Sequence, residues 1–470
     1  MSSTAVTTAL PAEAVAALRD AVPGGVDADD AARAAYSTDR SGTRSAGIAE
    51  LVLHPRSTAE VQEICRIASR YSVPVVPRGA GTGLAGGAVA GRGQIVVATD
   101  RMTSMVEISV GNQLAVVQPG ILNGDLNAVL AEHGLWWPPD PASKAISTVG
   151  GNIAMNAGGL LCAKYGVTRE AVLALTVVLA DGEVITVGHR TVKGVSGLDL
   201  CALFIGSEGT LGIITECTLK VRPMVTGVVP TIGAYFADAA AAARAASGVT
   251  AAGERPAIME LMDAALLQAV SDYTGEDMVS AGAAYLLVQT DGPDAVAEAE
   301  RIAEILRGAG ARSLEVTDDP EAAASLVDVR RSGFLAVEAR GTILVEDVAV
   351  PRDRIADMYQ GIDEIAARYG VFIATPCHAG DGNLHPTFVL DRGLDEVPDA
   401  VWDAAGEIFA HALELGGTLS GEHGIGLLKR RWLGDELGPR QLDLQRGIKA
   451  VFDPAGIMNP GKVFAPVAEA

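Results

Sequence analysis

The sequence lacks the features of a disulfide-stapled, iron–sulfur or membrane-spanning protein. Its five cysteines are widely spaced and none forms a C-x-x-C pair, which argues against a disulfide framework, a structural zinc site and an iron–sulfur cluster. No stretch approaches about 18 uninterrupted apolar residues, so we expect no transmembrane segment. The N-terminus has no basic region followed by an apolar core, so we expect no signal peptide. A cytoplasmic location fits best, with a peripheral position at the membrane left open.

Basic residues are also scarce. The chain has 36 Lys and Arg against 58 Asp and Glu, and its formal net charge is −22. This balance argues against a partner such as nucleic acid or another polyanion. With 470 residues, 49% of them hydrophobic and 20% charged, the chain is too long for a single core and has the composition of a globular enzyme.

Glycine, in contrast, is concentrated in one stretch. Pro77–Gly87 contains five glycines in eleven residues, which suits a backbone that offers its N–H groups to a phosphate. Gly81–Gly86 formally matches G-x-G-x-x-G, but that fingerprint needs a helix directly after it. Gly87–Gly93 and the strand-like Gln94–Thr99 leave no room for a helix, so we exclude a Rossmann site. A glycine-rich surface turn is the alternative interpretation.

Two further segments are rich in small and polar residues. Trp136–Gly159 carries few large apolar groups after its tryptophans, and Ile205–Thr215 is a shorter loop of the same kind. Small residues, hydroxyls and amides suit the walls of a site for a flat heteroaromatic ring with a polar tail. An ordered loop without a ligand is the alternative for Trp136–Gly159.

Hydrophobic periodicity predicts a strand-rich first half and then a separate α+β unit. The elements predicted in the first half are helices at Glu13–Asp20, after Ser57 and at Asn123–His133, and strands at Ala49–His54, Val73–Val76, Gln94–Thr99, Ser104–Ser109, Leu114–Gln118, Ala171–Ala180, Glu183–Val187 and Glu216–Val221. After Pro223–Pro230, strands at Thr231–Phe236 and Ala284–Thr290 alternate with alanine-rich helices at Ala237–Ser247 and Ala295–Ala309, and a strand at Val371–Thr375 follows. This rhythm favours an antiparallel sheet.

The most specific signal is a group of histidines in glycine-flanked loops. His378 and His385 flank Gly380–Asn383, a strong turn sequence that folds the chain back and brings the two imidazoles together. Glu422 and His423 are neighbours that point in different directions, so one can bind a metal while the other stays free as a base. Imidazoles joined by a carboxylate suit zinc, manganese or iron. Each histidine alone is more often structural, and only the combination favours a metal site.

These motifs together resemble a known flavoprotein family. The three small-residue segments resemble the FAD-binding half of the vanillyl-alcohol oxidase/p-cresol methylhydroxylase (PCMH) superfamily. The histidine motifs and Asn459–Lys462 resemble its D-2-hydroxyacid dehydrogenase branch, which includes FAD-linked D-lactate dehydrogenases, the flavin subunit of glycolate dehydrogenase and D-2-hydroxyglutarate dehydrogenases. The resemblance spans about residues 45 to 465 with its motifs in the expected order.

The resemblance implies an α+β fold, with a two-part FAD-binding domain of the PCMH type and an α+β substrate (cap) domain with an antiparallel sheet. We expect a helical lead-in over residues 1–45, the FAD-binding domain over 46–225, the substrate domain with the metal-site histidines over 226–420, and a C-terminal segment that returns to the flavin over 421–470.

Site residues follow from the resemblance position by position. The expected FAD contacts are Arg78, Gly79, Ala80, Gly81, Thr82, Gly83 and Leu84 around the pyrophosphate, Pro139, Asp140, Ser147, Thr148, Gly151, Asn152, Ala154 and Gly158 along the flavin, Gly209 and Ile214 towards the adenosine, and Asn459. The metal ligands would be His378, His385 and Glu422, and the catalytic base His423. Arg330 matches the arginine that binds the substrate carboxylate, with Arg331 not excluded, and Asn383 would contact substrate or orient a ligand.

The resemblance also bears on substrate and partners. D-2-hydroxyglutarate enzymes carry a hydroxyl and a lysine where this chain has Phe334 and Val345, so a small monocarboxylic D-2-hydroxy acid of the D-lactate or glycolate type is expected. A 2-hydroxyglutarate dehydrogenase and a transferase like alkylglycerone-phosphate synthase are the alternatives. FAD is expected to be non-covalent, although Cys162 lies just beyond one loop. The electron acceptor (quinone, cytochrome, partner protein or dioxygen) and a homodimer stay open.

Overall fold

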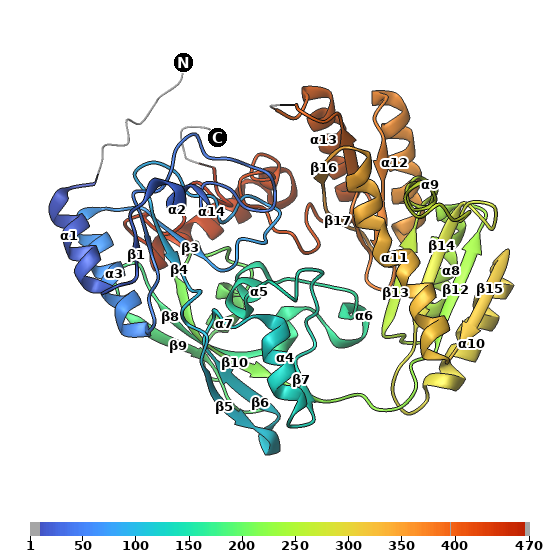
Figure 1. The fold of residues 1–470 in the computed structure, drawn as a ribbon, viewed down its shortest axis with the longest axis horizontal. Helices are drawn as coiled ribbons and strands as arrows, with labels where there is room; N and C mark the ends of the chain where they lie inside the picture. Colours follow the sequence, from blue (N-terminus) through green and yellow to red (C-terminus); the bar gives the residue numbers. More distant parts are fainter. Residues whose placement is uncertain (1–9, 395, 466–470) are drawn as a thin grey trace. The chain divides into compact units, whose positions relative to one another are not determined.

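The computed structural model describes residues 10–394 and 396–465, and the chain divides into two structural units. The first contains the residues up to Gly158, Val167–Met224 and the chain from His423 onward, whereas the second contains Gly159–Gly166 and Val225–Glu422. Figure 1 shows that helices and sheets are present in both. The predicted α+β class is confirmed.

The first unit begins with a small, mostly parallel sheet. Its strand order is β1 (Val26–Asp27), β2 (Leu51–Leu53), β4 (Ile95–Ala98) and β3 (Val75–Arg78), and β2, β3 and β4 are parallel. The helices beside it are α1 (Ala12–Ala21), α2 (Asp30–Ala34) and α3 (Thr58–Tyr71). The predicted cap of α3 is present, because the Ser57 hydroxyl accepts a hydrogen bond from the N–H of Glu60 at 3.2 Å. The apolar face of α3 packs into the core of this sheet.

A second sheet of the first unit is antiparallel throughout. Its order is β5 (Met105–Ser109), β6 (Leu114–Val117), β10 (Ile213–Lys220), β8 (Val172–Val178) and β9 (Val184–Gly188). The remaining elements of the unit are η1 (Val110–Asn112), α4 (Asn123–Ala131), β7 (Leu135–Trp136), α5 (Val149–Met155), η2 (Thr168–Ala171), α7 (Leu200–Phe204), β11 (Arg222–Pro223) and α14 (Leu433–Phe452), which is interrupted at Gly438. All the strands predicted in this half are present with shifted ends.

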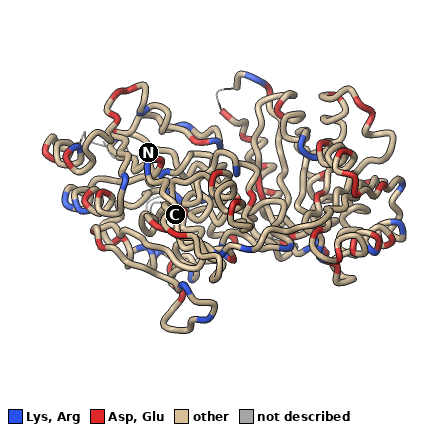
Figure 2. The backbone as a smooth tube through the Cα atoms, turned by 60° about the horizontal axis from the view of Figure 1, so that its bottom comes forward, with Lys and Arg blue, Asp and Glu red and all other residues tan. Residues whose placement is uncertain are grey.

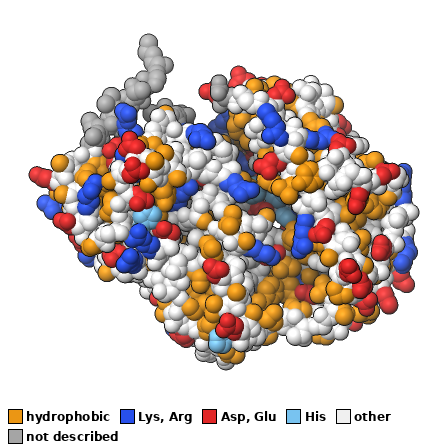
Figure 3. Space-filling view, in the orientation of Figure 1, with side chains coloured by type: hydrophobic (Ala, Val, Ile, Leu, Met, Phe, Trp, Pro, Cys, Tyr) orange, Lys and Arg blue, Asp and Glu red, His pale blue; other side chains and the backbone are white. Residues whose placement is uncertain are grey.

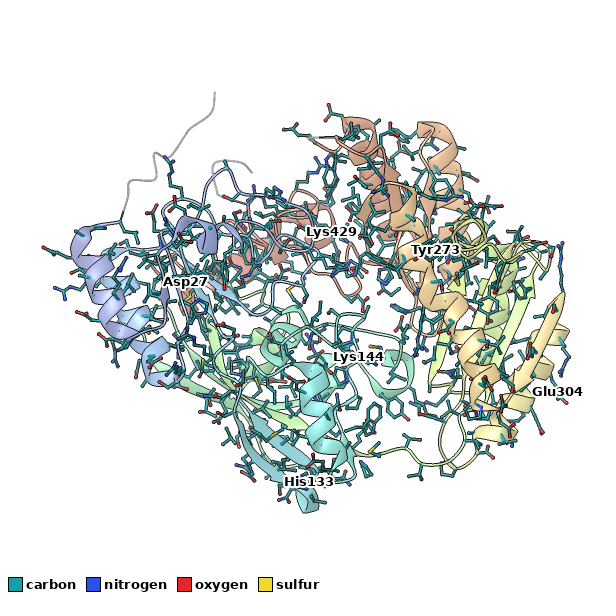
Figure 4. All side chains as sticks on the ribbon, viewed as in Figure 1. Asp27, His133, Lys144, Tyr273, Glu304 and Lys429 are labelled. Carbon is teal, nitrogen blue, oxygen red and sulfur yellow. The ribbon has the colours of Figure 1, made fainter. Side chains whose placement is uncertain are left out.

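Two boundaries differ from the sequence prediction. Helix α4 ends at Ala131, so His133 lies beyond it and is exposed (Figure 4). Part of Trp136–Gly159 is the helix α5 rather than a loop, because the Thr148 hydroxyl caps its first turn by accepting from the N–H of Gly151 at 3.2 Å.

The second unit is built on a seven-stranded antiparallel sheet. Its order is β15 (Ser313–Thr317), β12 (Thr231–Phe236), β14 (Ala284–Gln289), β13 (Ile258–Met262), β19 (Pro376–His378), β20 (Asn383–Leu384) and β17 (Val348–Ala349). A three-stranded sheet contains β16 (Thr342–Val345), β21 (Thr387–Leu390) and β18 (Ile373–Ala374). The helices are α6 (Cys162–Tyr165), α8 (Ala239–Ala251), α9 (Ala264–Thr274), α10 (Ala295–Gly308), α11 (Pro320–Arg340), η3 (Arg352–Arg354), α12 (Ile355–Tyr369) and α13 (Asp399–Glu414).

Helix α6 joins the second unit although it follows the second small-residue segment in the chain. Asp291 anchors it by accepting from the Lys164 ammonium and, at 2.6 Å, from the Tyr165 hydroxyl. Ala163 packs against Gly380 so closely that a Cβ at position 380 would lie within 3.0 Å of it. The sequence prediction had placed the residues of α6 in the FAD-binding domain, over residues 46–225.

Surface and core chemistry follow the composition. Acidic and basic positions are interspersed along the backbone (Figure 2), and apolar, acidic and basic side chains mix on the face shown in Figure 3. All five cysteines are buried, and none of them forms a disulfide within the described residues. None of the described helices has both the length and the apolar character needed to cross a membrane.

Candidate active site

The glycine loop leaves β3 and continues without a helix to β4, as predicted. The Arg78 guanidinium is bound to the protein itself, because Nη1 donates to the carbonyls of Thr38 at 2.8 Å and Ala88 at 2.9 Å. Its side chain therefore holds the N-terminal segment against the loop. Phosphate binding at Gly79–Leu84 would then depend on backbone N–H groups, which here lie in partly to fully exposed residues.

Gly79 lets the first predicted FAD segment touch the second. A Cβ at this position would lie closer than 3.0 Å to the Thr148 hydroxyl, a separation that real Cβ atoms essentially never show. Gly209 makes a similar approach to Pro77, with the nearest atom 3.1 Å from its ideal Cβ, and has a φ of 69°. The three small-residue segments therefore converge in the first unit.

A network of amides shapes the second segment. The Asn123 side chain donates to the carbonyl of Pro139 at 2.9 Å and to Asn152 Oδ1 at 3.3 Å, and Asn152 Nδ2 donates to the Ser147 hydroxyl at 3.2 Å. These side chains support one another and fix the loop ahead of α5. Asn123 was predicted as the start of a helix but not as a site residue. The signal that could have identified it was an amide side chain at the first position of that helix, beside the loop.

Glu208 connects the third segment to the C-terminal part of the chain. Its carboxylate accepts from the backbone N–H groups of Ile425 at 2.7 Å and Gly426 at 2.9 Å. Its carbonyl accepts from Asn459 Nδ2 at 2.7 Å, and the same amide donates to the carbonyl of Gly87 at 3.0 Å. Burial raises the pKa of Glu208 to about 7. The sequence interpretation missed this residue, although an acidic side chain between glycines in Gly206–Gly209 was a usable signal.

The remaining predicted FAD residues lie in or beside these segments. Ala154 accepts from the N–H of Glu208 at 2.8 Å, Gly158 is buried at the end of the second segment, Asp140 is partly exposed, and Ile214 packs in the core of the five-stranded sheet.

Two buried polar side chains near the C-terminus, those of Asn459 and Lys462, suit an anionic cofactor. Asn459 Oδ1 is buried and accepts no hydrogen bond within the described residues. Lys462 is only 4% exposed, its ammonium makes no hydrogen bond or ion pair with the described residues, and burial lowers its pKa to about 8. A buried cation and an open acceptor are costly without a partner. Both suit FAD, which carries a pyrophosphate and several hydrogen-bond donors.

The second unit brings the three predicted metal ligands together. Strands β19 and β20 form a hairpin, so the ring centroids of His378 and His385 are 5.0 Å apart with planes at 83°. Glu422 Oε1 lies 3.6 Å from His378 Nε2 and 3.3 Å from His385 Nε2. The three ligand atoms all lie within 4.8 Å of one another. A divalent cation fits this donor set.

Two buried carboxylates, both unpredicted, orient this group. Glu260 Oε1 lies 2.6 Å from His378 Nδ1, and the carboxylate is fully buried. Burial alone lowers the pKa of His378, but the carboxylates of Glu260 and Glu422 raise it well above its usual value. Asp347 is also fully buried, and accepts from the Ser420 hydroxyl at 2.6 Å and from the N–H of Glu422 at 3.1 Å.

The predicted substrate residues differ in their surroundings. Arg330 on α11 lies against Glu260, whereas the Arg331 side chain is 71% exposed and pairs with Asp328 at 3.5 Å. This contrast favours Arg330 as the functional arginine. Asn383 Nδ2 donates to Asp347 Oδ1 at 2.6 Å and to the carbonyl of Val348 at 2.8 Å. Of its two predicted roles, the geometry favours the orientation of a ligand.

His423 directly follows Glu422 and opens the part of the chain that belongs to the first unit. The backbone after it turns sharply, with φ of 85° at Gly424 and 49° at Gly426. Glu208 holds this turn through the two N–H groups described above. The carboxylate of Glu208, more than 200 residues earlier in the chain, therefore helps to fix the backbone that carries the predicted base His423.

Comparison with known proteins identifies the family. The FAD binding domain matches residues 49–188, and the description "FAD linked oxidases, C-terminal domain" matches residues 227–463. "Glycolate oxidase subunit GlcD" of Bacillus subtilis (strain 168) is 42% identical over 447 residues, which cover 94% of each chain. "D-lactate dehydrogenase" of Archaeoglobus fulgidus is 37% identical over 415 residues, 88% of this chain and 91% of that protein.

A solved structure supports the fold. The structure of p-cresol methylhydroxylase with substrate bound superposes with a TM-score of 0.80 at 17% identity and covers 97% of both chains. The predicted PCMH-type fold and the resemblance to the D-lactate and glycolate branch are confirmed. The chain belongs to the family of FAD-linked oxidases.

Proposed function

We propose that this protein oxidises a small monocarboxylic D-2-hydroxy acid, of the D-lactate or glycolate type, to the 2-oxo acid. The observation that carries the proposal is the group formed by His378, His385 and Glu422, linked through Glu260 to Arg330. The relatives named glycolate oxidase subunit and D-lactate dehydrogenase support the same reaction class.

The chemistry divides among the cofactors and the chain. Bound FAD would supply the acceptor for the hydride that leaves the substrate carbon. A divalent ion held by His378, His385 and Glu422, either zinc, manganese or iron, would lower the pKa of the substrate hydroxyl. Arg330 binds the substrate carboxylate in a charge-assisted pair and so fixes which hydrogen is presented. His423 takes the hydroxyl proton, because imidazole titrates near working pH.

The surroundings of Arg330 support a substrate with one carboxylate. Phe334 lies four residues later on α11, on the same side of the helix, and is 40% exposed. Val345, at the end of β16, is also apolar. Neither residue can bind a second carboxylate, so we propose that D-2-hydroxyglutarate is a poor substrate.

The electrons leave to an external acceptor, which we propose is a quinone, a cytochrome or a partner protein. The chain has no C-x-x-C-H haem motif and no cysteine cluster for an iron–sulfur centre. Five cysteines without a disulfide among the described residues fit a reducing compartment such as the cytoplasm.

Anaerobic bleaching of the flavin tests the reaction. The purified holoenzyme is mixed without oxygen with glycolate, both enantiomers of lactate and D-2-hydroxyglutarate, and the flavin absorbance is followed. We expect rapid bleaching by D-lactate or glycolate and slow bleaching by D-2-hydroxyglutarate. An Arg330→Gln control should need a much higher acid concentration for the same rate. If no 2-hydroxy acid bleaches the flavin, the proposal is wrong and a transferase without net redox chemistry becomes the better interpretation.

A further inference from the structure

One buried carboxylate contacts both the candidate metal histidine and the candidate substrate arginine. Glu260 Oε1 lies 2.6 Å from His378 Nδ1. Its other oxygen, Oε2, lies 3.1 Å from Arg330 Nε and 3.0 Å from Arg330 Nη2. Both oxygens of Glu260 are therefore used, by groups 118 and 70 residues away in the sequence.

The sheet fixes where this carboxylate lies. Glu260 is in β13 and pairs directly with His378 in the neighbouring antiparallel strand β19. The next pair along the two strands is Leu261 and Cys377, both fully buried. Side chains of directly opposed residues lie on the same face of a sheet. A strand held in the core on both sides leaves Glu260 little freedom to move.

The contact with His378 determines which of its nitrogens can bind a metal. An ionised Glu260 accepts only, so Nδ1 of His378 must carry the hydrogen. In the neutral imidazole the lone pair is then on Nε2, the atom that faces Glu422 at 3.6 Å. A carboxylate behind a ligating histidine in this way sets the tautomer, holds the ring and strengthens the ligand.

The contact with Arg330 determines which edge of the guanidinium is available. Glu260 Oε2 accepts the Nε–H and lies at ion-pair distance from Nη2, so it occupies the edge of the planar group that these two nitrogens form. The opposite edge, formed by Nη1 and the second N–H of Nη2, stays suited to a two-point pair with a substrate carboxylate. The Arg330 side chain is 17% exposed, so part of it reaches solvent.

We propose that Glu260 is a positioning residue that aligns the metal-binding nitrogen of His378 and the carboxylate-binding edge of Arg330 at the same time. The substrate half of this inference rests on the proposed function, whereas the metal half does not. One rigid carboxylate then sets the spacing between the two points at which a 2-hydroxy acid would be held, its hydroxyl end and its carboxylate end.

Glu260→Gln tests the proposal with little change in side-chain volume. An amide has one acceptor oxygen, so it can serve only one of the two partners and turns its NH2 group towards the other. We expect the Zn²⁺ dissociation constant to rise about 10- to 100-fold, measured by competition with a chromophoric chelator. We also expect KM for the 2-hydroxy acid to rise about tenfold or more, with a smaller change in kcat.

Asp263→Asn is the matched control. Asp263 is also buried, lies three residues after Glu260, and accepts from the N–H groups of Leu266 and Thr375 at 2.8 Å each. It contacts neither His378 nor Arg330 in these bonds, so its loss should lower thermal stability and leave Zn²⁺ affinity and KM unchanged. If Glu260→Gln behaves in the same way, Glu260 is only structural and the proposal is overturned.

A second variant and the behaviour of the wild-type protein separate the metal half of the proposal from the substrate half. If Glu260→Gln does not fold, Glu260→Asp replaces it, because the shorter side chain keeps the charge but cannot reach both partners. Wild-type protein that binds no Zn²⁺ overturns the metal half of the proposal. If Zn²⁺ affinity falls in the variant but no 2-hydroxy acid bleaches the wild-type flavin, the metal half stands and the substrate half fails together with the proposed function.

Discussion

Replacing Gly79 by alanine should separate two loops of the candidate FAD site that touch in the structure. An ideal Cβ at Gly79 lies closer than 3.0 Å to the Thr148 hydroxyl, with Gly151 Cα at 3.6 Å. Thr148 is not free to move, because its hydroxyl accepts from the N–H of Gly151 and caps α5. Gly83 in the same loop is the matched control. A Cβ there meets nothing within 4 Å, and its φ is outside the left-handed region.

The structure gives the expected size of both effects. In Gly79→Ala, overpacking costs about 1–3 kcal/mol, and loss of the Thr148 cap adds about 1 kcal/mol. The free energy of unfolding should therefore fall by about 2–4 kcal/mol. Gly83→Ala restricts the unfolded chain and fills open space, so it should stabilise the FAD-free protein by about 0.4–1 kcal/mol. If the pyrophosphate lies against the backbone of Gly83, the new methyl group weakens FAD binding without loss of stability.

Two measurements separate these effects. Thermal unfolding of FAD-stripped protein reports stability, and flavin fluorescence during titration with FAD reports affinity. We expect Gly79→Ala to lower both thermal stability and FAD affinity. Gly83→Ala should lower FAD affinity alone, by about tenfold or more, which corresponds to about 1.4 kcal/mol. A Gly79→Ala protein as stable as wild type would refute the contact between the loops. Unchanged FAD affinity in Gly83→Ala would remove the pyrophosphate from this part of the loop.

Three further predictions concern catalysis, metal and pH. His423→Asn should lower turnover about 10²- to 10⁴-fold, the usual contribution of a general base, while the flavin absorbance spectrum is retained; unimpaired turnover would remove His423 from that role. A strong chelator should abolish turnover without releasing FAD, and added Zn²⁺, Mn²⁺ or Fe²⁺ should restore it; full activity of metal-free protein would contradict the metal assignment. Asp100 and Asp27 accept hydrogen bonds from the His54 ring nitrogens at 2.7 Å and 3.0 Å, and these bonds raise the pKa of His54 against the effect of burial. The stabilising contribution of His54 is therefore complete below pH about 6.5 and is lost as the pH rises through the folded-state pKa. Because both aspartates are well exposed, His54→Gln should cost about 1 kcal/mol at pH 5.5, and thermal unfolding should show the difference from wild type narrowing towards pH 9.

Capping residues and hydrophobic periodicity predicted the helices whose own sequence favours them. Helix α3 was predictable because Ser57 and Glu60 form its cap and apolar residues recur at helical spacing. Helix α5 was not, because Val149–Met155 contains two glycines and an asparagine, which have low helix propensity. It forms in part because Gly150 packs directly against Pro119, where a Cβ would not fit. A tertiary contact stabilises helix α5, and the hydrophobic periodicity of a single sequence carries no information about such a contact.

The same limit applies to the candidate site. His378, His385 and Glu422 were predictable because glycines flank them and mark turns that bring polar side chains together. Glu260 lies in an ordinary strand, and Asp347 lies between two short strands. A charged residue in the otherwise apolar Ile258–Met262 was a weak signal, but only the pairing of β13 with β19 reveals what Glu260 contacts.

Each unit holds its candidate site with a carboxylate that faces the interior. Glu208 accepts from two backbone N–H groups just after His423, and Glu260 accepts from His378 and Arg330. A neutral amide replaces neither well, because both oxygens of each carboxylate are in use. Burial of a charge is costly, as the pKa of Glu208 near 7 indicates. The cost falls on stability, whereas the benefit is the placement of groups far apart in the sequence. We therefore expect both carboxylates to matter more for turnover than for folding.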